Sequence, residues 1–164
     1  LERARDLKKK PVAFLGAGHA YSHRSIAQKD DITVSGAVES SKRAFRRANI
    51  GLNDIDVFQI YDAFSGQLMV MLEDIGLCAK GDGGPFIEST DFGPGGQIAL
   101  NTSGGGLSYL HPGMFGMFLI IEAVRQLRGE CDQRQVPNAE TALVHGNGGV
   151  YFSEVTAILR AIGI

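Results

Sequence analysis

The chain alternates between short apolar runs that are typical of buried strands and longer runs with helical spacing. Residues 12–16 follow a proline and end in glycine, which predicts a buried strand that leaves into a loop. Residues 36–49 predict an amphipathic surface helix, and we expect Gly51 to supply its left-handed cap. The apolar positions that fall on one face of this helix are Val38, Phe45 and Ala48.

The middle of the chain repeats the order of strand and helix before it becomes glycine-rich. Residues 56–61 are rich in strand-forming types, and residues 65–75 place apolar side chains at i, i+3, i+4 and i+7. Residues 80–106 show no helical or strand periodicity, so we expect a long surface loop that is interrupted by a short strand at 97–101. A loop of this length inside a domain is usually functional.

Residues 113–128 predict a helix that is apolar on every side through its first turns, with Pro112 at the first helical position. A helix over about 112–128 with this pattern is expected to be fully buried. Glu122 and Arg125 interrupt the apolar run after about ten residues, whereas a membrane span needs about 20. The sequence therefore favours a core helix and no membrane span.

Two more strand-like runs, 141–144 and 150–159, flank the glycine-rich turn 145–149 and predict an antiparallel pair. The resulting order is strand, helix, strand, helix, loop, helix, strand, strand. This order predicts one α/β domain over 1–164, with a mixed five-stranded sheet covered by helices.

Charge and cysteine content narrow the class of partner and the compartment. The 16 Lys and Arg residues nearly balance the 18 Asp and Glu residues, so the net charge gives no electrostatic field strong enough to attract nucleic acid or an anionic membrane. Cys78 and Cys131 are too few for a disulfide scaffold, and no His or Cys spacing suits a metal. We expect a reducing, cytoplasmic location. The charged start at Leu1 has no signal-peptide pattern and suggests a cut within a longer protein.

Two side chains are the first candidates for chemistry. His111 precedes the apolar helix, where the helix N-terminus disfavours the imidazolium; a neutral ring could accept a proton or donate to an oxyanion. The alternative is a histidine that caps a core helix. Tyr61 lies at the exit of a predicted strand, where ligands of α/β sheets bind. The alternative there is a ring in the core with a solvated hydroxyl.

The turn 145–149 (His-Gly-Asn-Gly-Gly) is a third candidate, because its small residues let a substrate approach backbone N–H donors. A plain hairpin is the alternative.

Three segments in this order resemble the C-terminal half of a thiolase. Residues 44–65 (AFRRANIGLNDIDVFQIYDAFS) are similar to the stretch that leads into the NEAF or HDCF box of that family. Residues 101–130 (NTSGGGLSYLHPGMFGMFLIIEAVRQLRGE) resemble the box that carries the family histidine. Residues 134–149 (RQVPNAETALVHGNGG) resemble the box that reads CxGGG in many thiolases.

The resemblance assigns expected roles. It implies that His111 is catalytic, with Tyr61 at the head of the NEAF-like box and His145 at the position of the missing CxGGG cysteine. It also implies a substrate or oxyanion loop, whose expected members are Asn101, Gly104, Gly105, Gly148 and Gly149. The nucleophilic cysteine of thiolases belongs to their N-terminal half, so we expect this chain alone to be inactive.

The NEAF-like box begins with tyrosine and no acid/base cysteine is visible. In these two respects the sequence most resembles the lipid-transfer-protein-like or sterol-carrier-protein-type branch of thiolases. The resemblance implies a coenzyme A thioester as substrate, no bound cofactor, an acyltransferase that makes or cleaves C–C bonds in acyl-CoA, and a homo-oligomer. Some relatives in that branch work with an OB-fold, zinc-containing partner.

Two other functions stay open. One is a retro-aldolase of CoA-thioester side chains that uses Tyr61, and the other is a non-catalytic binding or dimerisation domain. The aldolase requires Tyr61 and His111 to face one cavity, with hydroxyl and imidazole within about 6 Å and with room for one carbonyl oxygen or water between them.

Overall fold

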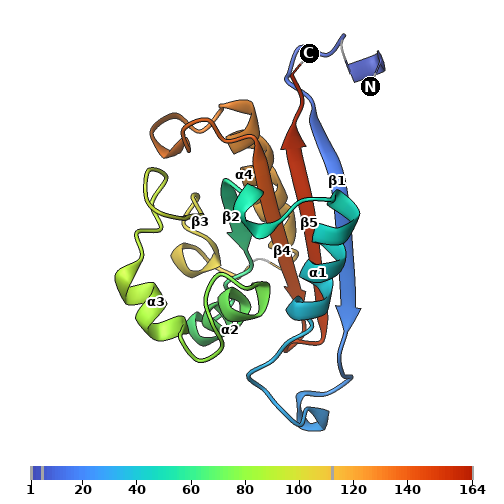
Figure 1. Ribbon diagram of the computed structural model, residues 1–164, viewed down its shortest axis with the longest axis vertical. Coiled ribbons are helices and arrows are strands. Elements are labelled where there is room, and N and C mark those ends of the chain that lie inside the picture. Colours follow the sequence, from blue (N-terminus) through green and yellow to red (C-terminus); the bar gives the residue numbers. More distant parts are fainter. Residues whose placement is uncertain (1, 5, 112, 164) are drawn as a thin grey trace.

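The computed structural model describes residues 2–4, 6–111 and 113–163. Its strands form one mixed sheet in the order β1-β5-β4-β2-β3 (Figure 1). The pairs β1–β5 and β5–β4 are antiparallel, whereas β4–β2 and β2–β3 are parallel. The strands are β1 Val12–Tyr21, β2 Val57–Ile60, β3 Ala99–Leu100, β4 Thr141–Gly148 and β5 Ser153–Ala161. The predicted α/β fold with a mixed five-stranded sheet is confirmed.

Helices cover the two faces of this sheet unequally. Helices α1 and α2 lie on one face and α4 lies on the other (Figure 1). The α-helices are α1 Ala37–Ala48, α2 Ser65–Ile75, α3 Gly83–Ser89 and α4 Gly116–Arg128. Short 3-10 turns occupy Glu2–Ala4, Ile26–Gln28, Leu52–Asp54, Gly106–Ser108 and Asp132–Arg134. Within the described ranges, no helix has both the length and the apolar character needed to cross a membrane.

Strand β1 continues to Tyr21, well past the predicted end at Gly16, because its glycines face helix α1. A Cβ atom on Gly18 would lie 2.1 Å from the Ser40 carbonyl oxygen, and one on Gly16 would lie 2.7 Å from the Ala48 nitrogen. These glycines therefore do not end the strand. They allow the helix to approach the strand backbone closely.

The same close approach changes the buried face of α1. Its buried residues are Ala37, Ser40, Ser41 and Ala44. Phe45 and Ala48 of the predicted apolar face are partly buried against the core, but Val38 is 39% exposed, so its place on that face was wrong. Only small side chains fit between helix and strand. The predicted cap was also wrong, because the left-handed residue at the end of α1 is Asn49 (φ 55°) and not Gly51 (φ −105°).

Helix α3 lies in the stretch that was expected to be a loop broken only by a strand. It begins after Asp82, and Pro85 occupies its first turn, a position that proline tolerates. The neighbouring glycines conceal this start signal in the sequence. The predicted short strand is confirmed, but β3 is only two residues long, Ala99–Leu100.

Helix α4 is not fully buried, and that prediction was wrong. It begins at Gly116, and Pro112 lies outside the described residues. One face packs on β2 and β4 through Leu119, Ala123 and Leu127. The opposite face is apolar but exposed, because the described chain places no further layer over it. Its most exposed members are Met117 (59%), Phe118 (54%) and Ile121 (48%).

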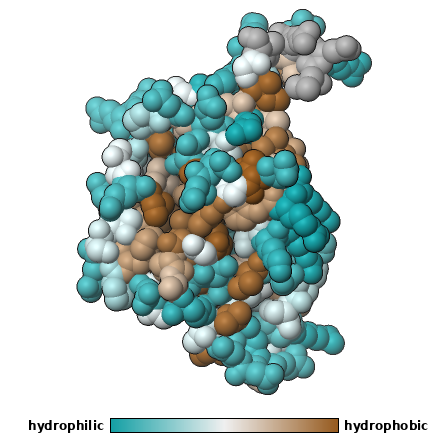
Figure 2. Space-filling model, viewed as in Figure 1, coloured by the Kyte–Doolittle hydropathy of each residue, from teal (hydrophilic) through white to brown (hydrophobic). Residues whose placement is uncertain are grey.

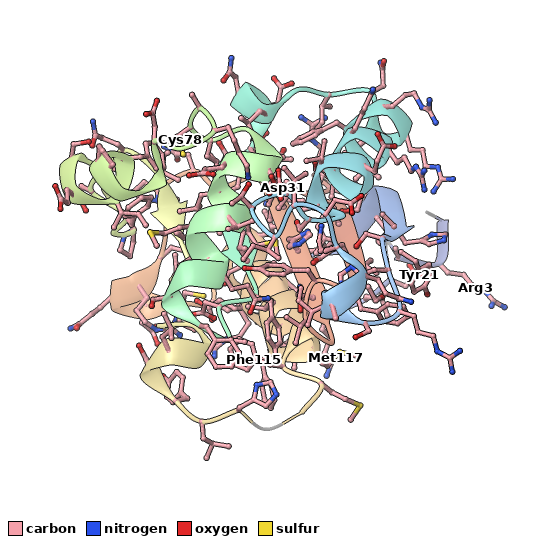
Figure 3. All side chains as sticks on the ribbon, turned by 90° about the horizontal axis from the view of Figure 1, so that it is seen from below. Arg3, Tyr21, Asp31, Cys78, Phe115 and Met117 are labelled. Atoms are coloured by element: carbon pink, nitrogen blue, oxygen red, sulfur yellow. The ribbon has the colours of Figure 1, made fainter. Side chains whose placement is uncertain are left out.

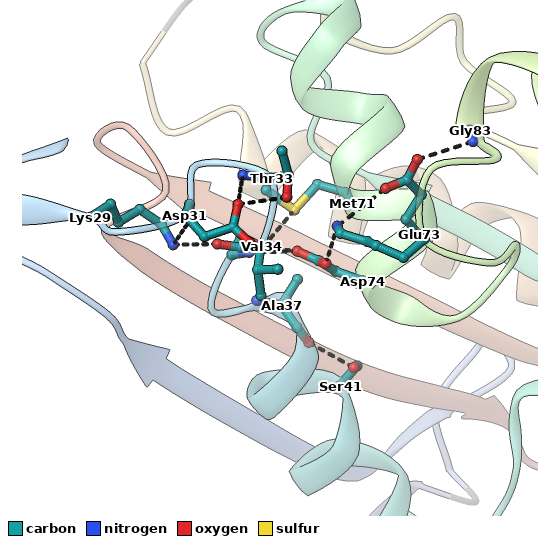
Figure 4. Close-up of polar contacts among 12 residues, drawn as sticks. Lys29, Asp31, Thr33, Val34, Ala37, Ser41, Met71, Glu73, Asp74 and Gly83 are labelled. Carbon is teal, nitrogen blue, oxygen red and sulfur yellow. Dashed lines mark hydrogen bonds and ion pairs between the residues drawn. The ribbon is translucent and has the colours of Figure 1, made fainter.

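The other face of the molecule is shown in Figure 2, where hydrophilic side chains flank an apolar region near the centre. A polar cluster ties α2 to the segment that precedes α1 (Figure 4). The Asp74 carboxylate accepts hydrogen bonds from the Ser35 backbone N–H (2.6 Å) and hydroxyl (2.7 Å), and from Lys80 (2.7 Å). Burial lowers the pKa of Lys80, but these carboxylate contacts outweigh it and raise that pKa. The cluster fixes the C-terminal end of α2.

Candidate active site

A cavity of about 710 Å³ opens where the parallel strands β2 and β4 end. Four segments meet there: the exit of β2, the start of α2, the loop that leads to α4, and the turn between β4 and β5. The lining residues are Tyr61, Ala63, Phe64, Gly66, Gln67, His111, Gly113, Met114, Asn147, Gly148, Gly149, Val150 and Tyr151. The carboxyl ends of parallel strands are the usual ligand site of α/β folds.

Tyr61 and His111 are in direct contact in this cavity. The Tyr61 hydroxyl oxygen lies 2.9 Å from His111 Nδ1, and the two rings are nearly perpendicular. The Tyr61 ring also packs edge-to-face on Phe115, at 5.5 Å between centroids. Figure 3 shows Phe115 and Met117 on the side of the molecule where the His111 loop lies. The contact lies within the limit of about 6 Å expected for this pair, but the hydroxyl and the imidazole touch directly, so no room is left for a carbonyl oxygen or water between them.

The environment of the phenol decides which groups can carry protons. Tyr61 is 7% exposed, and burial, helped by the neighbouring Asp62 charge, raises the pKa of its hydroxyl. The phenol is therefore protonated at neutral pH. Two hydrogen-bonding arrangements satisfy the contact: the hydroxyl donates to Nδ1 and leaves Nε2–H as a donor, or Nδ1–H donates to the phenol and leaves Nε2 as an acceptor.

The loop that carries His111 is held by the buried carboxylate of Asp62. This carboxylate accepts hydrogen bonds from the backbone N–H groups of Gly106 (2.6 Å) and Leu107 (3.2 Å). Gly104 (φ 101°) and Gly105 (φ 65°) adopt left-handed backbone conformations, and a Cβ on Gly105 would lie 2.2 Å from an Asp62 oxygen. These glycines let the loop reach Asp62, and neither lines the cavity. Sequence reasoning gave Asp62 no role, although it follows Tyr61 in the same box.

Asn101 supports the same region from the sheet. Its side chain accepts from the Ile60 N–H and donates to the Ile60 carbonyl, both at 2.8 Å, and so continues the hydrogen bonding of β3 along β2. This contact fixes the end of β2, and Tyr61 is the next residue along the chain. Asn101 itself does not line the cavity.

The structure does not bring His145 to Tyr61 and His111. The Tyr61 N–H donates to the His145 carbonyl at 2.9 Å, yet the side chains belong to opposite faces of the sheet, because His145 pairs in register with Ile60. The imidazole is 0% exposed and lies between Glu154 Oε2 and Thr156 Oγ1, each at 2.9 Å. The predicted turn 145–149 was wrong, because strand β4 continues to Gly148 in its pairing with β5. Gly148 and Gly149 do line the cavity.

Three further polar residues line the cavity: Asn147, which lies within the candidate segment 145–149, and Tyr151 and Gln67, to which sequence reasoning assigned no role. Asn147 donates to Glu154 Oε1 at 2.5 Å, which joins the cavity wall to the buried His145. Tyr151 has a left-handed backbone (φ 56°), and burial, reinforced by Glu154, raises the pKa of its hydroxyl. Gln67 is the third. Asn147 and Tyr151 flank the glycine pair of the turn, which is the one sequence signal that could have suggested them.

No group of three or more metal-ligating side chains occurs within residues 2–4, 6–111 and 113–163. The cavity instead offers a phenol, an imidazole, a carboxamide and backbone N–H groups. This set suits hydrogen bonding to carbonyl and hydroxyl oxygens and the transfer of protons.

Comparisons with known proteins agree with this fold. Residues 18–161 match the family model "Thiolase C-terminal domain-like". The chain is 39% identical over 111 residues to "Sterol carrier protein 2" of Bos taurus, covering 67% of this chain and 20% of that protein. It is 34% identical over 150 residues to "Acetyl-CoA acetyltransferase" of Methanothermobacter thermautotrophicus, covering 90% of this chain and 39% of that protein.

Among solved structures, the fold is similar to that of an "Ltp2-ChsH2(DUF35) aldolase", with a TM-score of 0.85 and 29% identity, covering 98% of this chain and 42% of that one. Sterol carrier protein 2 and the acetyl-CoA acetyltransferase are much longer than this chain, which spans 20% and 39% of their lengths, respectively. The family match covers most of the chain and includes both Tyr61 and His111. This chain belongs to the thiolase superfamily, as a thiolase C-terminal domain.

Proposed function

We propose that this domain supplies His111 and Tyr61 to an enzyme that makes or cleaves a C–C bond in an acyl-CoA thioester. The observation that carries the proposal is the 2.9 Å contact between the Tyr61 hydroxyl and His111 Nδ1, at the wall of a cavity of about 710 Å³. The nucleophilic cysteine of a thiolase would come from an N-terminal thiolase half. The substrate is a coenzyme A thioester, and the proposal needs no other cofactor.

In the acyltransferase reading, His111 does the main work. When the Tyr61 hydroxyl donates to Nδ1, the Nε2–H of His111 is free to stabilise a thioester oxygen as negative charge develops on it. The raised pKa of Tyr61 supports this arrangement, because the phenol keeps its proton at neutral pH. Names of relatives also support it, including "Acetyl-CoA acetyltransferase" and the "Benzoylsuccinyl-CoA thiolase subunit BbsB" of Thauera aromatica.

In a retro-aldolase, the donor and acceptor roles of the Tyr61–His111 hydrogen bond would be exchanged. When Nδ1–H donates to the phenol oxygen, the Tyr61 O–H is free to donate to a substrate oxygen, and Nε2 can accept a proton from a β-hydroxyl. The C–C bond then breaks to give a carbonyl fragment and an enolate, which takes up a proton. The likeness to the "Ltp2-ChsH2(DUF35) aldolase" favours this second candidate.

The test compares His111→Ala and Tyr61→Phe in the full-length protein, with His19→Ala on the exposed face of β1 as the matched control. An acyltransferase should lose about 100- to 1,000-fold in kcat with His111→Ala, as for loss of an oxyanion donor, and less with Tyr61→Phe. A retro-aldolase should reverse this order. If neither change lowers turnover more than about threefold, the domain is a non-catalytic scaffold and the proposal fails.

The uncovered apolar face of α4 supports a partner layer. Met117, Phe118 and Ile121 would be covered by the N-terminal thiolase half, and the whole enzyme would be a homo-oligomer in the cytoplasm. An OB-fold, zinc-containing protein, as the family resemblance implies, is a further candidate partner, and the name of the aldolase neighbour pairs Ltp2 with a second component, ChsH2(DUF35). This chain alone should therefore self-associate, and light scattering that shows only monomer at high concentration would contradict the proposal.

A further inference from the structure

Two adjacent residues that follow β1 hold the turn between β4 and β5. The Ser22 backbone N–H donates to the Phe152 carbonyl at 3.3 Å, and the Ser22 hydroxyl donates to the Tyr151 carbonyl at 2.9 Å. His23 Nε2 lies 2.8 Å from the Val150 carbonyl oxygen. Three successive carbonyls of the turn are therefore bound by Ser22 and His23, which we call the clamp. Figure 1 shows that the chain leaves β1 at the end of the sheet where β4 turns into β5.

The turn depends on contacts from outside because its own backbone is strained. Gly149 (φ 65°) and Tyr151 (φ 56°) are left-handed, and a residue other than glycine keeps this conformation only where its surroundings hold it. The pairing of β4 with β5 ends at Gly148 and Ser153, before the turn begins. Gly149, Val150 and Tyr151 all line the active-site cavity. The clamp therefore sets the shape of this part of the cavity wall.

Aromatic packing adds to the hydrogen bonds of the clamp. The Phe152 ring lies 5.5 Å from the Tyr21 ring and 6.4 Å from the His23 ring, measured between centroids. Two titratable residues adjoin His23 from the packed elements, Tyr21 at the end of β1 and Tyr151 in the turn, and Arg24 follows it along the chain. Among the described residues, the one ion pair that involves a histidine is the buried pair of His145 with Glu154. Hydrogen bonds, and not an ion pair, therefore decide which form of His23 fits the clamp.

The number of hydrogen atoms in the clamp depends on the charge of His23. Because a carbonyl only accepts, Nε2 must carry the hydrogen that the Val150 contact uses. Nδ1 lies 2.8 Å from the Ser22 hydroxyl oxygen, whose single hydrogen is used for the Tyr151 carbonyl. In the imidazolium form, Nδ1–H donates to that oxygen and every contact is satisfied. In the neutral form, Nδ1 and the Tyr151 carbonyl compete for one hydroxyl hydrogen, so one contact is lost.

We propose that Ser22 and His23 are positioning residues for the active-site cavity, and that their clamp is complete only when His23 is protonated. The clamp then holds the cavity wall firmly below the pH range in which imidazoles ordinarily change charge, and it loosens as the pH rises through that range. A firm wall keeps the cavity in the shape that receives a ligand, so loss of the clamp should weaken ligand binding. This inference rests on the proposed acyl-CoA function for its ligand, whereas the clamp itself does not depend on it.

The test compares the wild type with His23→Gln in the full-length protein at about pH 6 and pH 8, on either side of the usual imidazole range. Glutamine keeps a donor for the Val150 carbonyl but does not titrate. At pH 6 calorimetry should show that acetyl-CoA binds the variant about threefold more weakly, as for the loss of one hydrogen bond. At pH 8 the two proteins should bind it equally. Deuterium uptake by peptides that cover 149–152 should be faster in the variant at pH 6 and equal at pH 8.

Two further variants separate the clamp from a general effect of histidine removal. In a Ser22→Ala background, His23→Gln should have the same effect at both pH values, because Nδ1 has lost its acceptor. His19→Gln is the matched control, since His19 is an exposed histidine on β1, and it should change neither binding nor exchange at either pH.

An effect of His23→Gln that is equal at pH 6 and pH 8 would overturn the inference, and so would unchanged exchange at 149–152. A pH-dependent effect that persists in the Ser22→Ala background would also overturn it. If the wild type binds no acetyl-CoA at either pH, that result counts against the proposed function, and the exchange of 149–152 still decides whether the clamp exists. Binding of acetyl-CoA with no response to His23→Gln would remove this inference alone.

Discussion

The two histidines of the thiolase-like boxes lie in opposite environments. His111 is exposed at the end of a glycine-rich loop, and its partner is the Tyr61 hydroxyl at the cavity wall. His145 is 0% exposed between Glu154 and Thr156, in the layer between the sheet and α1. The difference teaches that a histidine in a matching box can serve either chemistry or the interior. The strand register, which sets the face of the sheet, separates the two.

The largest effect that tests this contrast is expected at His145. His145→Leu leaves the fully buried Glu154 carboxylate without its imidazole partner. Removal of one member of a buried pair typically costs about 3 to 5 kcal/mol, so the free energy of unfolding in urea should fall by about that much. A second variant, His145→Leu with Glu154→Leu, should recover a large part of the loss. A fall below about 1 kcal/mol would mean that the buried pair has no structural importance.

His111→Ala is the matched variant on the exposed side. His111→Ala removes an exposed ring and one hydrogen bond to the Tyr61 hydroxyl, so the free energy of unfolding should fall by about 1 kcal/mol, well below the loss expected for His145→Leu. The contrast in urea unfolding between the two histidines would disappear if His111→Ala were as destabilising as His145→Leu.

Asp62→Asn should have the next largest effect, because it weakens the anchor of the His111 loop. The carboxylate accepts from two backbone N–H groups, and hydrogen bonds to a charged group contribute about 1.5 to 3 kcal/mol each. We expect a loss of about 2 kcal/mol in unfolding free energy and a lower kcat, because His111 loses its position. Unchanged turnover in the full-length protein would show that the loop does not need this anchor.

Tyr61→Phe should have a smaller effect on stability, about 1 kcal/mol, because it removes one hydrogen bond. The raised pKa of Tyr61 means that the phenol is protonated in the folded and unfolded chain at every pH below about 10. The stability difference between wild type and variant should therefore stay constant from about pH 8 to pH 9, above the range in which imidazoles ordinarily change charge. Above about pH 9 the unfolded chain ionises first, so the contribution of the phenol falls as the pH rises through the folded pKa. A difference that already falls between about pH 8 and pH 9 would contradict the raised pKa.

The smallest expected effect concerns the reactivity of Cys131, which is buried in the interior on the α4 side of the sheet. The thiol is 2% exposed, and burial, together with the nearby Glu122 charge, raises its pKa to about 11. Because the thiolate is the reactive form, Cys131 should resist brief alkylation by iodoacetamide at pH 8 in the folded protein. Mass spectrometry should detect modification of the partly exposed Cys78 first. Equal labelling of both cysteines would mean that this interior opens readily.

Local patterns predicted some features well and others poorly, for physical reasons. Helix α2 has the bounds that its i, i+3, i+4, i+7 spacing predicts, since that period follows from helix geometry alone. Helix α3 was missed because glycines obscure its start signals. The burial of α4 was predicted wrongly, because an apolar residue in the sequence does not say whether a covering layer is present in the same chain.

The sequence by itself determined the α/β order, the mixed sheet, the family and the candidate pair of Tyr61 and His111, because these depend on local periodicity and on residues within short motifs. Tertiary structure alone decided which histidine reaches the cavity, that Asp62 anchors the loop that carries His111, and that Asn147 and Tyr151 join the cavity wall. The physical reason is that these contacts join residues 40 to 50 positions apart or depend on which face of a strand a side chain occupies. Strand pairing and helix packing set both, and no short segment of the sequence encodes them.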